Sequence, residues 1–340
     1  MRFAYLLFSL ILCLSCVDSK EIINIVPPEE TLNVDDSEFI IHQTFTKGDV
    51  RRYGVFPEQT ISTNDFKNVL SLANQGLPIY FPPGYYNTSI SLENTSNVTI
   101  KFDEVILAGH LQITNNSERI KINGSVTILD KLFIVQSHDI SFEKVIVKSN
   151  QTQNIYEQKN RGVSIYAGSK NIKFDSLFIS DTGATGDDFF KHTSASLQIH
   201  GWNYNPKNIQ INKLEINNAG RTALYLTGQN HKLNNIKISN FGLGSNENMF
   251  GLDDAKTGEE TVFSALWINK CNNCEIDSLD IYSTTPNKRG YSLRLDEGRY
   301  HEPTFINNIR MSGSAKQLPI FDDQLTNILV KNEYYDQELN

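Results

Sequence analysis

This chain of 340 residues has few basic residues: 31 Lys and Arg against 39 Asp and Glu. The formal net charge is -8 and the pI is near 5.4. A nucleic-acid partner needs a basic face to neutralise its phosphates, so this balance argues against DNA or RNA binding. Hydrophobic residues are also few, at 39%. This fraction is low for a protein with a globular core.

Cysteine is scarce as well, with 4 residues, two of them in the segment 1–16. The other two, Cys271 and Cys274, form a C-x-x-C pair. A structural zinc site needs four ligands, and no histidine cluster lies near this pair in the sequence. Cys274 falls at a repeat position that is occupied elsewhere by Ile209 and Ile172, so we expect a buried core thiol. A local disulfide is the alternative.

The N-terminal apolar run, from Phe3 to Leu14, is too short to span a bilayer. It follows a charged start at Arg2, and the segment 1–16 is predicted to be an export signal. Leu14-Ser15-Cys16 resembles the end of a bacterial lipoprotein box, in which Cys16 is lipid-modified. Cys13 departs from that pattern, and plain signal-peptidase cleavage is the alternative. We expect a lipoprotein of the cell surface or outer membrane, or else a periplasmic or secreted protein, with no other membrane contact.

The segment after the signal, 17–46, is acidic, contains Pro27-Pro28 and shows no sustained periodicity, as a tether does. The folded part is predicted to be a single domain over 47–340, and we expect a monomer. An amphipathic stretch from Thr63 to Asn74 predicts a short helix near its start, with Thr63 or Asn64 as the N-cap.

One short apolar pattern recurs from Phe142 to Met311: an apolar residue, two mostly polar residues, an apolar residue, any residue and an apolar residue. Its copies are 142–147, 174–179, 211–216, 233–238, 276–281 and 306–311. The closing alternation has a period of two, which predicts short strands with one buried face. A second strand follows in most copies, at 197–199, 224–226, 266–268 and 293–295. Such coils, with polar insertions between them, predict an all-β protein that is a parallel β-helix from about Asn97 to Asn332.

The order V-x-x-Y-G at 50–54, a short helix, and I-Y-F-P-P-G-x-Y at 79–86 resembles the opening of the pectate lyase superfamily. This resemblance implies a right-handed parallel β-helix whose N-terminal end is covered by a small helix. It also implies a carbohydrate ligand, since the superfamily includes polysaccharide lyases, glycoside hydrolases, epimerases and viral tailspikes. Its polygalacturonase-like members carry G-H-G followed by R-x-K. This chain has Arg119-Ile120-Lys121 but no G-H-G, so we interpret that match as chance.

The second strands predict which side chains point outward. Each carries a leucine that we align in one inward column: Leu197, Leu224, Leu266 and Leu293. The residues that follow them form an outward column, with neighbours about 4.8 Å apart: Gln198, Tyr225, Trp267 and Arg294. Two positions further along, a third column contains His200, Thr227, Asn269 and Asp296. Because large aromatics are rarely left exposed without a partner, we interpret the first outward column as a sugar-stacking platform with a cation for an acidic sugar. The alternative is that an insertion covers these aromatic residues.

Three classes of function fit these residues. The first is a polysaccharide lyase, which must neutralise the carboxylate of a uronate and remove the adjacent proton. We assign Arg294 to the first task and His200 or Tyr225 to the second. The residues predicted to bind substrate are Trp267, Gln198, Arg221 and Lys256.

The second class is a glycoside hydrolase with carboxylates such as Asp187, Asp254 or Asp296 as acid and base. The doublets Asp187-Asp188 and Asp253-Asp254 could instead bind Ca²⁺ or belong to a solvated acidic loop. The third class is a non-catalytic glycan-binding surface protein, because the chain contains no complete catalytic motif.

Overall fold

The computed structural model describes residues 33–148, 162–182, 195–201, 203–243, 263–284, 290–295, 302–317, 320–322 and 328–335. The chain divides into two units, Met1–Leu32 and Asn33–Asn340, and the fold described here belongs to the second unit. No helix within the described ranges has the length and apolar character needed to cross a membrane.

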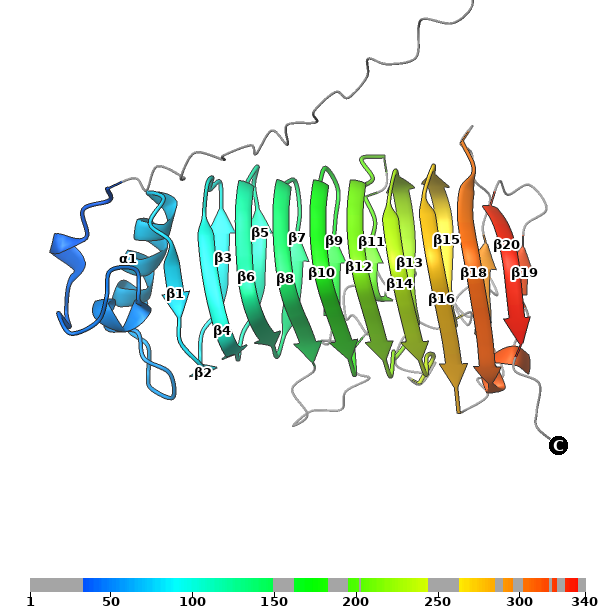
Figure 1. The fold of residues 1–340 in the computed structure, drawn as a ribbon, viewed down its shortest axis with the longest axis horizontal. Coiled ribbons are helices and arrows are strands. Elements are labelled where there is room, and N and C mark those ends of the chain that lie inside the picture. The colour runs from blue at the N-terminus through cyan, green and yellow to red at the C-terminus, as the bar shows by residue number, and fades with distance from the viewer. Residues whose placement is uncertain are drawn as a thin grey trace, which may run out of the picture. The chain divides into compact units, whose positions relative to one another are not determined.

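The described part of the second unit is a parallel sheet of 20 strands, with helical turns in its N-terminal cap and in a short 3-10 helix, η5 (Ser314–Gln317) (Figure 1). Two sets of strands alternate along the chain, and each strand pairs with the next member of its own set. The A strands are β4 (Thr99–Leu107), β6 (Glu118–Ile128), β8 (His138–Lys148), β10 (Lys170–Ser180), β12 (Lys207–Asn217), β14 (Lys232–Ser239), β16 (Glu275–Ser283), β18 (Thr304–Gly313) and β20 (Ile328–Tyr335). The B strands are β3 (Ile90–Glu93), β5 (Leu111–Thr114), β7 (Lys131–Ile134), β9 (Gly162–Ile165), β11 (Ala195–Ile199), β13 (Thr222–Gln229), β15 (Phe263–Asn272), β17 (Gly290–Leu295) and β19 (Ile320–Asp322). This topology is the one expected for a parallel β-helix with one A and one B strand in each coil.

The six copies of the apolar pattern all lie in A strands, as predicted, and their apolar residues stack in columns. Phe142 of β8 pairs with Phe174 of β10, which pairs with Ile211 of β12. The rings of Phe142 and Phe174 stack with centroids 4.6 Å apart. The alternation of buried and exposed residues places one face of every A strand in a continuous apolar interior. The four predicted second strands are parts of the B strands β11, β13, β15 and β17.

Strand pairing begins before Asn97, the residue near which the β-helix was predicted to start. Strands β1 (Ile79–Phe81) and β2 (Gly84–Tyr86) both pair with β4, on either side of Pro82-Pro83. Proline lacks the N–H that a ladder needs, so the two prolines divide this first A-type segment into two short strands. The sequence therefore predicted the strand and turn here correctly, but not that they belong to the first coil.

The N-terminal end is covered by the helix α1 (Thr63–Asn74), whose bounds are those predicted from the sequence. Its N-cap is Ser62, one residue before the predicted cap, and the Ser62 hydroxyl accepts a hydrogen bond from the Asp65 N–H at 3.4 Å. The apolar face of α1, which includes Phe66, Val69 and Leu72, is buried. The helix thus covers apolar interior that an open solenoid end would expose.

The folded unit also begins before the boundary near Lys47 that the sequence suggested. Val34 and Asp36 are buried in the segment assigned to the tether. The Asp36 carboxylate accepts hydrogen bonds from the Tyr53 hydroxyl at 2.7 Å and from Arg52 Nε at 2.8 Å. Burial alone would raise the pKa of Asp36, but these two hydrogen bonds outweigh it and hold the pKa below its ordinary value. A polar network of this kind has no periodicity, which is why the sequence did not reveal it.

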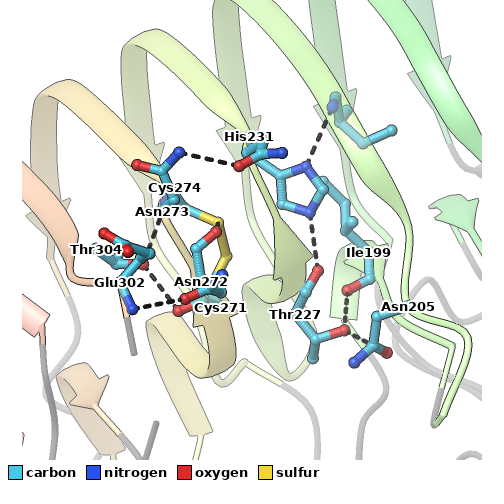
Figure 2. Close-up of a disulfide and its surroundings, with 12 residues drawn as sticks. Ile199, Asn205, Thr227, His231, Cys271, Asn272, Asn273, Cys274, Glu302 and Thr304 are labelled. Atoms are coloured by element: carbon cyan, nitrogen blue, oxygen red, sulfur yellow. Dashed lines mark hydrogen bonds between the residues drawn. A yellow bond between two sulfur atoms is a disulfide. The ribbon is translucent and has the colours of Figure 1, made fainter. Parts of the chain in front are cut away.

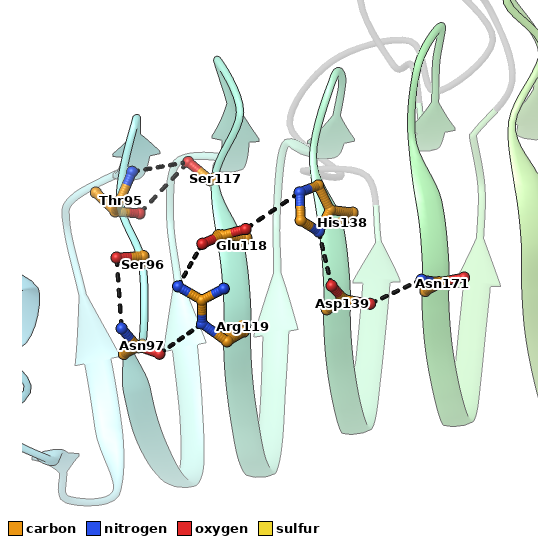
Figure 3. A network of polar contacts seen from close by, with 9 residues as sticks. All are labelled: Thr95, Ser96, Asn97, Ser117, Glu118, Arg119, His138, Asp139 and Asn171. Atoms are coloured by element: carbon orange, nitrogen blue, oxygen red, sulfur yellow. Dashed lines mark hydrogen bonds and ion pairs between the residues drawn. The ribbon is translucent and has the colours of Figure 1, made fainter.

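Polar ladders run along the turns that lead into the A strands (Figure 3). Asn97, Arg119, Asp139, Asn171 and Asn208 all have left-handed backbone conformations, with φ between 53° and 60°. Their side chains connect successive coils: Asn208 donates to Asn171 at 2.9 Å, Asn171 to Asp139 at 2.8 Å, and Arg119 to Asn97 at 2.7 Å. Asparagine adopts this conformation more readily than most residues, which suits it to three of these five positions. Arg119 also pairs with Glu118, and its place in this early ladder agrees with our view that the R-x-K match is chance.

Candidate functional site

The candidate site is the outward face of the B strands. Gln198 pairs with Tyr225, Tyr225 with Trp267, and Trp267 with Arg294, which confirms the predicted alignment of this column. The leucines before these residues form the predicted inward column. We call Gln198, Tyr225, Trp267 and Arg294 the outer column. Because side chains alternate along a strand, its members lie outside the coil wall while the leucines lie inside.

The aromatic members of the outer column stack on one another. The ring centroids of Tyr225 and Trp267 are 4.4 Å apart, and the Arg294 guanidinium carbon lies 4.1 Å from the centroid of the Trp267 ring. On the other side, the ring of His200 lies 5.3 Å from that of Tyr225. These contacts order the side chains as His200, Tyr225, Trp267 and Arg294 across four neighbouring B strands. A cation over an aromatic face is an attractive arrangement, so Trp267 also holds the guanidinium in place.

The prediction that these aromatics form an exposed platform is wrong. Only 2% of Tyr225 and 8% of Trp267 are exposed, and they form a separate apolar cluster with Ala195, outside the interior of the coils. The register is nevertheless the predicted one, so burial does not come from a shift by one residue. Rings on adjacent coils are only about 4.8 Å apart, a distance at which each ring covers the face of its neighbour. Arg294, at the end of this stack, is half-buried.

Gln198 extends the outer column toward earlier coils. It is buried, and its side-chain oxygen accepts a hydrogen bond from the Tyr166 hydroxyl at 2.5 Å. Tyr166 follows β9 directly, and its ring packs edge-on against Phe133 of β7 at 5.3 Å. The sequence analysis missed Tyr166 because it lies in no copy of the repeat. Gln198 therefore has a hydrogen-bond partner inside the protein, and its contact with a substrate stays a prediction.

His200 lies next to the outer column, at the C-terminal end of β11. Burial, and to a smaller extent the positive charge of Lys270, lowers the pKa of His200 to about 4. The imidazole is therefore neutral at pH 7 and can accept a proton. Lys270 lies in a β-bulge: the pairing of β13 with β15 shifts after Leu226, so that Thr227 faces two residues, Asn269 and Lys270. The Asn269 amide donates a hydrogen bond to the Tyr225 hydroxyl at 3.3 Å.

Arg221 lies at the opposite, N-terminal end of β13. Only 2% of this residue is exposed, and its carbonyl accepts the N–H of Gly242 at 3.0 Å. An arginine keeps its charge when buried, so it must be held by acceptor groups. The segments 183–194, 244–262 and 285–289 each lead into a B strand, β11, β15 and β17 respectively, at this same end. Arg221 is thus placed where the long insertions join the B strands, as expected for a site built on loops.

Several predicted site residues lie outside the described residues: Asp187, Asp188, Asp253, Asp254, Lys256, Asp296 and the lipidation candidate Cys16. The structure therefore tests neither the paired carboxylates of the hydrolase hypothesis nor a calcium site on the acidic doublets. Asp296 is placed by sequence alone, two residues after Arg294 on the chain.

Cys271 and Cys274 form a disulfide, which was the alternative to the buried thiol that we favoured from the sequence (Figure 2). Both sulfurs are buried, and Cys274 does occupy the interior column that contains Ile172 and Ile209. Between Ile209 and Cys274 the sequence analysis missed His231, because a histidine breaks the apolar pattern of that column.

His231 is buried and fully hydrogen-bonded (Figure 2). Its Nδ1 accepts the Ile209 N–H at 3.1 Å, and its Nε2 donates to the Thr227 carbonyl at 2.9 Å. Burial lowers its pKa to about 4. Within the described ranges, His231, Cys271 and Cys274 are the one group of three metal-ligand types close together. Because both ring nitrogens are hydrogen-bonded and the sulfurs are bonded to each other, this group is a packed structural unit and not a ready metal site.

Comparisons with known proteins add one distant likeness. No model of a protein family matches the chain, and no curated protein matches it. Among solved structures, ORF18 of Geobacillus virus E2 is similar with 15% sequence identity and a TM-score of 0.34. The match covers 85% of this chain but only 60% of that protein, so this chain spans less than two thirds of the viral protein. A likeness of this size carries no conclusion about fold or function.

Proposed function

We propose that this protein is an exported polysaccharide lyase that cleaves an acidic, uronate-containing glycan by β-elimination. The scaffold is proposed to be a right-handed parallel β-helix of the pectate lyase superfamily, exported by the segment 1–16 and anchored through Cys16. The site is the outer column with His200 beside it. The monomer acts on its polysaccharide without a nucleic-acid partner.

The observation that carries this proposal is the local charge. The chain has a formal net charge of -8, yet one cation lies on the aromatic stack and two more lie on the coils of Tyr225 and Trp267. Arg294 lies over Trp267, Lys270 is near enough to affect His200, and Arg221 is buried where β13 begins. Positive groups gathered around aromatic rings suit a sugar that carries a carboxylate.

β-Elimination needs a cation at the sugar carboxylate and a base at the adjacent C–H. A cation neutralises the sugar carboxylate, which makes the neighbouring C–H more acidic. A base takes that proton, the electron pair forms a carbon–carbon double bond, and the glycosidic oxygen leaves with a proton. Arg294 supplies the cation because its guanidinium is half-buried and held by Trp267, so little ordering is needed when the substrate arrives.

The register limits which residues can act together. His200 and Arg294 are on β11 and β17, three strand spacings or about 14 Å apart. This distance is larger than one sugar, so His200 cannot remove a proton next to a carboxylate that Arg294 neutralises. The base that acts with Arg294 must come from nearby, and Asp296 on the same chain segment is our candidate. His200 can serve as a base only with a nearer cation, and Lys270 is such a cation.

One assay tests the proposal. The folded protein is incubated with a panel of acidic and neutral polysaccharides, and both the ultraviolet absorbance of unsaturated products and new reducing ends are measured. We expect both signals, from an acidic polymer only. Arg294→Ala should lower turnover about a hundredfold if the guanidinium meets charge that develops in the transition state. Arg119→Ala, on the exposed turn ladder, is the matched control and should leave turnover unchanged.

Two other outcomes would overturn the lyase proposal. Reducing ends without absorbance would mean hydrolysis, and Asp254→Asn or Asp296→Asn should then be the more damaging change. Binding without either signal would mean a non-catalytic glycan-binding protein.

A further inference from the structure

The loop 200–206, between β11 and β12, presents one of the most exposed aromatic side chains among the described residues. Tyr204 is 76% exposed, although it follows the buried His200 by only four positions. Its exposure is not that of a loose loop: the Tyr204 N–H donates to the Gly201 carbonyl at 2.9 Å, and its own carbonyl accepts the Gly168 N–H at 2.8 Å. A large apolar ring held in water by a fixed backbone is unusual without a ligand.

The loop is tied to the coil wall beside the bulge. The side-chain oxygen of Asn205 accepts the Gly201 N–H at 2.9 Å. The same oxygen accepts the Thr227 hydroxyl at 2.9 Å (Figure 2). Thr227 in turn faces Asn269 and Lys270 across the shifted pairing of β13 and β15. Tyr204 and Lys270 therefore lie two coils apart, with the hydrogen-bonded Thr227 on the coil between them.

Lys270 brings a positive charge to this place. It is exposed, and its left-handed backbone, with a φ of 53°, is part of the bulge. No carboxylate among the described residues lies within ion-pair distance of its ammonium group. His200 directly follows β11, two coils away, and the charge of Lys270 adds to the burial that lowers the pKa of its imidazole. An aromatic ring, a cation and a neutral imidazole thus gather at the C-terminal ends of β11, β13 and β15.

From this arrangement we infer that Tyr204 and Lys270 form a binding subsite for one acidic sugar, at the C-terminal ends of the B strands and outside the outer column to which Arg294 belongs. Tyr204 stacks on the apolar face of the sugar ring, and Lys270 pairs with its carboxylate. The inference deepens the proposed function and rests on it for the class of ligand. It assigns roles to two residues that lie outside the outer column.

The test measures binding of the intact protein to polygalacturonate and to the same polymer after chemical reduction of its carboxyl groups, by affinity electrophoresis in the cold. Lys270→Ala should weaken binding of the polyuronate about tenfold and leave binding of the reduced polymer unchanged. Tyr204→Ala should weaken binding of both polymers by a similar factor, about tenfold, because the stacking contact does not depend on the carboxylate. Tyr204→Phe keeps the ring and should bind like the wild type.

Matched controls come from the A strands. Tyr282→Ala removes an exposed tyrosine from β16, and Lys237→Ala removes an exposed lysine from β14. Both should bind like the wild type. If Tyr204→Ala and Lys270→Ala bind like these controls while the wild type releases unsaturated products, the subsite is refuted and the lyase proposal stands. If the variants lose binding as described but no polymer is cleaved, the subsite stands and the lyase proposal fails. A wild type that binds neither polymer refutes both.

Discussion

The early coils, from β3 to β8, and the later coils, from β11 to β18, have the same kind of interior and different outward faces on their B strands. Leu111 in β5 and Leu224 in β13 belong to one inward column, and both are fully buried. The outward residue beside them is Gln112 in the early coil and Tyr225 in the later one. The interior specifies the fold in both regions, and the later coils add the groups from which a site can be built.

In the later coils, one apolar column of the interior is interrupted. The column that contains Ile140, Ile172 and Ile209 in successive coils continues with His231 and the disulfide-bonded Cys274. These polar and covalent groups lie beside the bulge that positions Lys270. The comparison teaches that the departures from the repeat, inside and outside, are concentrated in the same coils. Four changes test this comparison.

The largest effect should come from a charge in the shared interior. Leu224→Asp and Leu111→Asp should both prevent folding, because an unpaired carboxylate in an apolar interior costs several kcal/mol or more. Circular dichroism and size-exclusion chromatography measure the outcome, with Leu224→Met as the volume-conserving control. If only one of the two aspartate variants failed to fold, the early and later interiors would not be equivalent.

Substitutions in the outer column should lower stability more in the later coils than at the corresponding positions of the early coils. Trp267→Ala removes a buried ring from the aromatic stack and should lower the free energy of unfolding by about 3 to 5 kcal/mol. Gln112→Ala, at the corresponding position of an early coil, should change it by about 0.5 kcal/mol or less. Urea unfolding curves compare the two variants with the wild type. Equal losses would mean that the outer column contributes to stability in the same way along the whole solenoid.

The buried histidines should make stability depend on pH. Burial lowers the pKa values of His200 and His231 to about 4, below the ordinary value near 6.5. Between these values the unfolded chain binds more protons than the folded one, so stability is complete above about pH 6.5 and is lost as the pH falls toward 4. Each histidine should account for a loss of about 2 kcal/mol between pH 7.5 and pH 5.

His231→Gln keeps a hydrogen-bonding side chain without this titration, so it should remove about half of that pH dependence. Urea unfolding at the two pH values measures it. An unchanged pH dependence in His231→Gln would contradict the assignment of the titration to the interior of the later coils.

The smallest of the four effects should come from the disulfide. Cys271 and Cys274 close a loop of only a few residues, for which the chain-entropy model gives about 2 kcal/mol. The double variant Cys271→Ser, Cys274→Ser should therefore fold and unfold at a slightly lower urea concentration than the wild type. Reduced wild-type protein is the control and should match the variant. A loss comparable to that of Trp267→Ala would mean that the disulfide supports the whole bulge and not only its own turn.

Much of the fold could be predicted because it depends on local, periodic signals. The alternation in each copy of the repeat determined the A strands, the leucines determined the register of the B strands, and α1 was found with its correct bounds. The alignment of Gln198, Tyr225, Trp267 and Arg294 followed from that register alone. A register error of one residue would have placed all of these side chains on the other face of the sheet.

Contacts between coils were decided only by the tertiary structure. Burial of Tyr225 and Trp267 and the pairing of Asp36 with Arg52 both depend on groups that are far apart in the sequence. The bulge at Thr227 inserts one extra residue into one strand, and no periodic signal marks it. The sequence determined which residues repeat and which face they take, because strand geometry has a fixed period. The structure decided which of them touch, because such contacts depend on how far each coil is displaced from the next.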